Sequence, residues 1–212
     1  MPGILYHLAF AEEVYSSLLP THDINRSLFM SGNLIPDLAT DKKASHYRQN
    51  SSSIVNFLVP DILQAKKELY SLDNPLFLGM YCHLYLDYQF IMNFLIPEFI
   101  WDTDKKLVIN PRNKMQWDFE TFFSSDGIYG SYTEINELLL RDGRVSMQTL
   151  TELPDALPLT GLSVFDTRYS RTWRQELNGY IAEQKAYTGN IFNYERLCNF
   201  IHQTAKKFVN EI

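Results

Sequence analysis

Cysteine is scarce in this chain of 212 residues, which contains only Cys82 and Cys198. Two widely separated cysteines exclude a disulfide-rich scaffold and the paired spacing of a zinc knuckle. Both lie in apolar segments, so we expect them to be buried free thiols.

Positive charge is also in the minority, with 19 lysines and arginines against 25 aspartates and glutamates and a formal net charge of −6. No basic block stands out along the chain. Duplex nucleic acid is bound mainly through phosphate contacts from lysine and arginine. We therefore expect no duplex nucleic acid as a partner, whereas a small phosphate-bearing ligand held through a metal ion fits this composition.

Targeting and membrane signals are missing as well. The first 19 residues, MPGILYHLAFAEEVYSSLL, lack a basic stretch and include two glutamates, unlike a signal peptide. The longest apolar run, Pro75–Trp101, is interrupted by polar residues that are costly inside a bilayer. These are His83, Asp87, Gln89, Asn93 and Glu98. We expect no transmembrane segment and a cytoplasmic location.

Strand-like alternation is rare, and apolar residues instead recur at helical spacing. Hydrophobic residues make up 45% of the chain and aromatic residues 14%, which is enough for a substantial core. The sequence therefore predicts an all-α fold in a single domain over residues 1–212. The expected helices span residues 4–18, 24–30, 54–72, 74–95, 115–123, 131–142, 168–186 and 193–210.

Local signals suggest where these helices begin and which segments are loops. Asn74-Pro75 is a typical helix start, with asparagine as N-cap and proline in the first turn. Ser131-Tyr-Thr-Glu134 has the form of a capping box, and Asp23 is expected to cap the helix that follows it. Residues 31–53 and 151–166 are expected to be loops because they contain glycine and proline among polar residues. Residues 102–113 are expected to be irregular, with one short extended piece.

One polar pair lies on the apolar face of the predicted helix 74–95. His83 and Asp87 are four residues apart, so their side chains lie about 5–6 Å apart on the same face. A zinc ion could accept a nitrogen from one and an oxygen from the other. The simpler interpretation is a buried histidine hydrogen-bonded to an aspartate, with no ion.

Further residues, in a fixed order, extend this pair into a recognisable pattern. They are His7 on the first helix, Gly32-Asn-Leu-Ile-Pro-Asp37, the loop residue His46, and Gly79-x-x-x-His83-x-x-x-Asp87. The set resembles the zinc-dependent phospholipase C family, whose helical fold is shared with the S1/P1 nucleases. The similarity covers about half of the chain and is greatest to short bacterial phospholipase C-like hydrolases.

This resemblance implies a metal-dependent hydrolase. His46, His83 and Asp87 would hold one Zn²⁺ ion, and His7 and Asp87 would help to hold another. Asp37 would be a metal ligand or the catalytic base that orients the attacking water. The expected substrate is a small phosphoester, in the first place a phosphodiester, and a phospholipid headgroup would qualify.

The chain departs from the larger family members in two ways. No histidine follows Asp87 within a few residues, and the sequence contains no H-x-x-x-E motif. We therefore expect one or two metal ions and not three. The missing ligands favour a second hypothesis, a metal- or ligand-binding module of the same fold with reduced catalysis. A third hypothesis is an interaction protein with a metal-free His–Asp pair.

Each candidate residue also has a plain structural interpretation. His7 would be a half-buried surface histidine, Asp37 a turn or cap residue, and His46 part of a solvated loop. His202 has no ligand partner in sequence and is expected to be structural, and Arg48 to be a surface residue. Thr21-His22-Asp23 contains the adjacent pair of HD-domain phosphohydrolases, but His7 lies too close in sequence to be the upstream histidine that those enzymes require.

Overall fold

The computed structural model describes residues 3–50, 57–166, 173–182 and 185–212. They are mostly helical, as predicted, with two small antiparallel sheets that the sequence analysis did not predict. The longer helices are α1 (Ile4–Leu18), α2 (Arg26–Leu38), α4 (Ile62–Leu69), α5 (Pro75–Phe90), α8 (Ile128–Arg141), α10 (Trp173–Ala182) and α11 (Tyr194–Glu211). The short helices are α3 (Lys42–Ser45), α6 (Ile96–Glu98), α7 (Phe119–Phe122) and α9 (Met147–Glu152).

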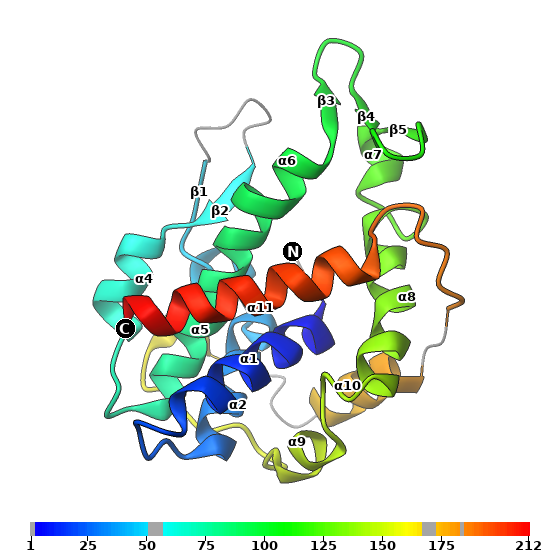
Figure 1. Ribbon diagram of the computed structural model, residues 1–212. Helices are drawn as coiled ribbons and strands as arrows, with labels where there is room; N and C mark the ends of the chain where they lie inside the picture. Colours follow the sequence, from blue (N-terminus) through cyan, green and yellow to red (C-terminus); the bar gives the residue numbers. More distant parts are fainter. Residues whose placement is uncertain (1–2, 51–56, 167–172, 183–184) are drawn as a thin grey trace.

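Helices α1, α2, α4 and α11 all pack against α5. Helix α5 continues through a π-helical turn, Ile91–Leu95, into α6. Helices α1 and α11 pack together and run across α5, as Figure 1 shows, and α2 packs along α5. Phe10 of α1, Phe90 of α5 and Phe208 of α11 are fully buried in one hydrophobic cluster. Both cysteines are buried free thiols, as expected.

The start of α5 is as predicted. The Asn74 side chain accepts a hydrogen bond from the backbone N–H of Phe77 at 3.3 Å, and Pro75 is the first helical residue.

Within the described ranges, no helix combines the length and the apolar character needed to cross a bilayer.

The prediction of a loop over residues 31–53 is wrong for 31–38, 42–45 and 48–50, which form helices and a strand. Helix α2 runs through Gly32 and Pro36 to Leu38, and its N-cap is Asn25, not Asp23. Helix α3 and strand β1 (Arg48–Asn50) follow, while residues 51–53 lie outside the described ranges. Pro36 lies inside α2, where it cannot donate the helical backbone hydrogen bond, and the helix ends two residues after it, at Leu38.

Gly32 and Gly79 lie where α2 crosses α5. A Cβ atom on Gly32 would lie 2.0 Å from the carbonyl oxygen of Leu76, and one on Gly79 would lie 2.1 Å from that of Phe29. The two backbones can approach this closely only because neither residue has a side chain. This contact overrides the weak helix propensity of glycine and brings Asp37 beside the polar pair on α5.

Replacing Gly32 by alanine should therefore destabilise the protein. The added methyl group meets a backbone oxygen that cannot rotate away, so we expect a loss of about 1–3 kcal/mol, as for other overpacked interiors. Gly179→Ala on α10 is the matched control, since nothing lies within 4 Å of the added atom. The control should be neutral or gain about 0.5–1 kcal/mol. Urea denaturation measures both, and equal stabilities would contradict this account of the crossing.

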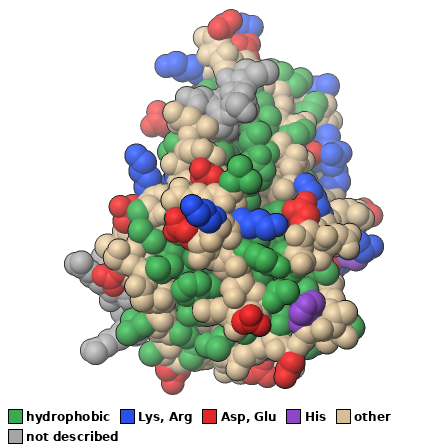
Figure 2. All heavy atoms as spheres, turned by 90° about the vertical axis from the view of Figure 1, so that its left-hand side faces the viewer, with side chains coloured by type: hydrophobic (Ala, Val, Ile, Leu, Met, Phe, Trp, Pro, Cys, Tyr) green, Lys and Arg blue, Asp and Glu red, His purple; other side chains and the backbone are tan. Residues whose placement is uncertain are grey.

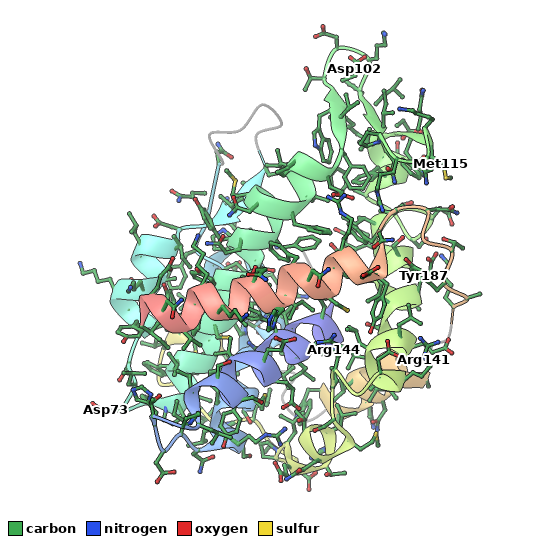
Figure 3. The ribbon with its side chains drawn as sticks, viewed as in Figure 1. Asp73, Asp102, Met115, Arg141, Arg144 and Tyr187 are labelled. Carbon is green, nitrogen blue, oxygen red and sulfur yellow. The ribbon has the colours of Figure 1, made fainter. Side chains whose placement is uncertain are left out.

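The segment after α6 contains a small sheet. Strands β3 (Ile100–Asp102), β4 (Leu107–Ile109) and β5 (Gln116–Asp118) pair antiparallel in that order. The predicted helix over 115–123 is thus half wrong, because α7 starts only after β5, with Asp118 as its N-cap. Asp102 and Met115 mark this sheet in Figure 3, where it projects beyond the helices.

The predictions of helices over residues 54–72 and 131–142 are partly right. Strand β2 (Leu58–Pro60), which pairs with β1, replaces the beginning of the helix predicted over 54–72, whose residues 54–56 lie outside the described ranges. Helix α8 begins after Gly127, so Ser131 lies inside it and caps nothing. Its end before Asp142-Gly143 is confirmed, and Gly143 has a positive φ of 66°.

The C-terminal predictions hold in outline. The expected loop 151–166 contains the last residues of α9 and one 3₁₀ turn, Ser163–Phe165. Helix α10 is shorter than the predicted 168–186, of which 168–172 and 183–184 lie outside the described ranges, and α11 agrees with the prediction within a residue. The face drawn in Figure 2 shows acidic and basic side chains interspersed, without a continuous basic surface.

Candidate metal centre

All five predicted site residues come together between α1, α2, α3 and α5. His7 projects from α1, Asp37 from the last turn of α2, His46 from the end of α3, and His83 and Asp87 from α5. The side chains of His7, His46, His83 and Asp87 are at most 1% exposed, and that of Asp37 is 13% exposed. The plain interpretations of His7 as a surface residue, His46 as a solvated loop residue and Asp37 as a turn residue are therefore wrong.

The carboxylate of Asp87 is at the centre of the group. Its Oδ1 atom lies 3.2 Å from Nε2 of His7, and its Oδ2 atom lies 3.4 Å from Nε2 of His46 and 3.7 Å from Nε2 of His83. The two oxygens thus face different histidines. This is the arrangement that a carboxylate bridging two ions would require.

Asp37 closes the group from the side of α2. Its Oδ1 atom lies 3.6 Å from Nε2 of His46, and its Oδ2 atom lies 4.0 Å from Nε2 of His83. The Nε2 atoms of His46 and His83 are 3.3 Å apart, and the rings of His7 and His83 stack with centroids 3.7 Å apart. Three imidazoles and two carboxylates therefore converge on a few ångströms of space.

Backbone carbonyls orient two of the three histidines. Nδ1–H of His83 donates to the carbonyl of Asn33 at 2.7 Å, and Nδ1–H of His46 donates to the carbonyl of Lys42 at 2.8 Å. A neutral imidazole carries one N–H group, so Nε2 of each ring is left with a bare lone pair. Outer contacts of this kind are typical of metal-binding histidines. The Ser45 hydroxyl donates to the carbonyl of Pro36 and thereby ties α3 to α2.

The inward-facing atoms do not satisfy one another. Neither carboxylate oxygen of Asp87 and neither ring nitrogen of His7 has a hydrogen-bond partner in the described part of the chain. The His83–Asp87 distance of 3.7 Å is too long for a hydrogen bond. A buried carboxylate without a partner is costly, and lone pairs on nitrogen and oxygen face one another across the gap. A cation between them would remove both penalties.

The spacing also fits a metal ion. Ligand atoms bonded at about 2.1 Å to a tetrahedral zinc ion lie about 3.4 Å from one another. The distances between the histidine Nε2 atoms and the carboxylate oxygens of Asp37 and Asp87 range from 3.2 to 4.0 Å. Two sets have their ligand atoms within 4.8 Å of one another: His46 with His83 and Asp87, and His7 with Asp37 and His83. The first is the predicted set. The second pairs His7 with Asp37 and His83, whereas the sequence analysis expected His7 to share Asp87, which the 3.2 Å contact also allows.

Burial shifts the pKa values of these residues. It lowers the pKa of His7, His46 and His83 from 6.5 to about 4, so all three are neutral and able to bind a metal at pH 7. Burial raises the pKa of Asp87, although the imidazoles of His83 and His46 oppose it. Burial would also raise the pKa of Asp37, but His83, His46, His7 and Lys42 together hold it below its ordinary value.

These shifts predict how the metal-free protein responds to acid. Between pH 6.5 and pH 4 the three histidines take up protons in the unfolded chain and not in the folded one, so stability should fall as the pH is lowered. Each unit of pKa shift is worth about 1.4 kcal/mol. The raised pKa of Asp87 acts in the opposite sense, but three histidines outweigh one carboxyl group. Urea denaturation of chelator-treated protein at pH 7, 6, 5 and 4 measures this, and a flat or rising stability toward pH 4.5 would contradict it.

The other residues considered from the sequence lie outside the centre. His22 contacts the hydroxyl of Thr21, and Nδ1 of His202 lies 2.8 Å from Oε2 of Glu13. The HD-type pair His22-Asp23 belongs to neither of the two groups of described residues that could hold a metal ion. Arg48 is half-buried at the start of β1.

The sequence did not predict two sets of polar groups: the backbone carbonyls that orient the histidines, and two buried tyrosine hydroxyls. The carbonyls of Asn33 and Lys42 give no signal in a sequence, because every residue has one. The hydroxyls of Tyr6 and Tyr132 are buried without a hydrogen-bond partner among the described residues. Burial and the nearby carboxylate of Asp87 both raise the pKa of Tyr132. The position of Tyr132 in an apparent capping box hid this placement.

The chain matches no protein-family model, no curated protein and no solved structure.

Proposed function

We propose that this chain is a metal-dependent hydrolase of phosphoesters that uses one or two zinc ions, with phosphodiesters as the favoured substrates. The observation that carries the proposal is the group of unpartnered, inward-facing ligand atoms around Asp87. Three neutral imidazoles and two carboxylates form a donor set that zinc prefers. A small substrate with an accessible phosphoryl group, such as a phospholipid headgroup, suits a group of five side chains of which that of Asp37 is the most exposed.

His46, His83 and Asp87 would hold one ion, with Asp37 adjoining. His7 and the other oxygen of Asp87 would contribute to a second ion. Bound zinc lowers the pKa of its water from 15.7 to about 7 and stabilises charge on phosphoryl oxygens. The protein's own part is to hold the imidazoles neutral and oriented through the carbonyls of Asn33 and Lys42. Asp37 would bind the metal or accept a proton from the attacking water.

We also propose that the helical fold is of the phospholipase C and P1 nuclease type. What supports this relationship is the order of the ligands along the chain and the elements that carry them. The histidine of the first helix, the Gly-x-x-x-Pro-Asp segment, the histidine after it and the pair on the long helix all reach one centre. The Gly-x-x-x-Pro-Asp segment belongs to helix α2 and not to a loop, and its glycine serves the crossing with α5.

The second candidate function is a metal- or ligand-binding module of this fold with reduced catalysis. The observation that favours it is the lack of a third ligand set, since Tyr88, Gln89 and Phe90 follow Asp87 and no histidine does so within the next few residues. A metal-free His–Asp interaction pair is disfavoured, because His83 and Asp87 are too far apart to bond each other.

Metal removal and restoration test the enzyme function. Zinc-loaded protein should hydrolyse at least one of bis(p-nitrophenyl) phosphate, p-nitrophenyl phosphate and a short-chain phosphatidylcholine. A strong chelator should abolish the activity, and added zinc should restore it. Stoichiometric zinc without turnover on any of these substrates would favour the binding module. Protein that binds no zinc would overturn the hydrolase and a metal-binding module, and would leave only a module that binds another ligand.

A further inference from the structure

Among the five side chains of the candidate metal centre, that of Asp37 is the most exposed. The other four side chains are at most 1% exposed, whereas that of Asp37 is 13% exposed. Among the described residues the exposed edge of the centre is therefore this carboxylate, in the last turn of α2 and ahead of α3.

One cation lies at this exposed edge. The ammonium group of Lys42 is 3.8 Å from Oδ1 of Asp37, and the lysine side chain is 57% exposed. Arg48 is a second cation near the centre, since its charge contributes to the lowered pKa of His46, whereas Lys42 pairs with Asp37 directly. Its neighbour Lys43 instead lines a separate open pocket with Tyr47 and Gln64. The two lysines thus have the same chemistry and different surroundings.

The main chain and the side chain of Lys42 make separate contacts with the centre. Its carbonyl accepts the Nδ1–H of His46 and so fixes that ring. Its side chain reaches the exposed edge of the centre. Replacing the side chain leaves the carbonyl in place, so effects on metal binding and effects on an incoming ligand can be measured separately.

We propose that Lys42 is a positioning residue that binds a non-bridging oxygen of the substrate's phosphoryl group at this exposed edge. The inference rests on the proposed function. Lysine binds phosphate as a compact, mobile point charge with three donors. A half-exposed lysine–carboxylate pair contributes little stability, so the ammonium can leave Asp37 for a more highly charged anion at small cost. A cation held by Asp37 would favour that exchange, because it neutralises the carboxylate.

A rival role is that Lys42 acts only on Asp37, by keeping it ionised. Inorganic phosphate distinguishes the two roles, because it probes anion binding without turnover. Wild-type protein, Lys42→Met, Lys42→Arg and the matched control Lys43→Met would be loaded with zinc and freed of excess zinc. Phosphate affinity would be measured by calorimetry, zinc per chain by elemental analysis, and folding by thermal melting.

We expect Lys42→Met to weaken phosphate binding about 10- to 100-fold, the range for a lost hydrogen bond between charged groups. Lys42→Arg should keep most of the affinity, Lys43→Met should match the wild type, and all four proteins should carry the same zinc. Wild-type affinity in Lys42→Met would overturn the role of Lys42 and leave the proposed function intact. Loss of zinc in Lys42→Met would show that the residue acts on the ligand set, which also overturns it. A wild-type protein without zinc would overturn the proposed function itself.

Discussion

Replacing His83 by alanine is expected to empty the metal centre and abolish turnover. His83 belongs to both ligand sets, its ring stacks on that of His7, and its Nε2 lies 3.3 Å from that of His46. Loss of an outer contact to a metal ligand typically costs about 10- to 100-fold in metal affinity, and loss of the ligand itself should cost more. The melting temperature of the zinc-loaded form should fall too, since metal binding contributes folding free energy.

The matched control for this variant is His202→Ala. His202 is about half-exposed and its partner is Glu13, outside the centre. Zinc content by elemental analysis and turnover on the most active phosphoester should be unchanged in the control. A His83→Ala protein that retains stoichiometric zinc would contradict the assignment of both sets.

Replacing Asp37 by asparagine is expected to lower turnover by a factor of about 10² to 10⁴, the range for loss of a general base. The substitution keeps the size of the side chain and one oxygen, and it removes the charge. If Asp37 serves as the base, the zinc content should change little, because His46, His83 and Asp87 still hold an ion. If Asp37 is a metal ligand, zinc and thermal stability should fall together with turnover.

Asp73→Asn is the control for this second variant, because Asp73 is exposed and lies in the turn before α5. It should match the wild type in turnover, zinc content and melting temperature. Wild-type turnover in Asp37→Asn would exclude Asp37 from the chemistry and leave the base unassigned.

The sequence predicted the residues that come together at the candidate site more completely than it predicted the secondary structure around them. The spacing of His83 and Asp87 on an apolar stripe indicates a polar pair in the core, because helical geometry alone places both on one face. His7, Asp37 and His46 were added through a resemblance, and the structure brings all three to the pair. No local pattern could show that His7 contacts Asp87, because the contact joins α1 to α5 across 80 positions of sequence.

The main error had a physical cause. Gly32 and Pro36 are helix-breaking residues by local propensity, so residues 31–53 were predicted to be a loop. In the structure the absence of a side chain on Gly32 lets α2 approach α5, and this packing outweighs propensity. Of the sheet β3–β5, one extended piece was predicted within residues 102–113, where β4 lies. The other two strands were missed because each has only three residues, too few for alternation to be recognised.

The central claim is that a metal ion lies between Asp87 and its histidines. Anomalous diffraction at the zinc absorption edge, from crystals grown with zinc, tests it most directly. The account predicts a peak within bonding distance of Nε2 of His46, Nε2 of His83 and an oxygen of Asp87, with or without a second peak beside His7. A well-ordered map without any peak there, in which His83 and Asp87 are bonded only to each other, would contradict it.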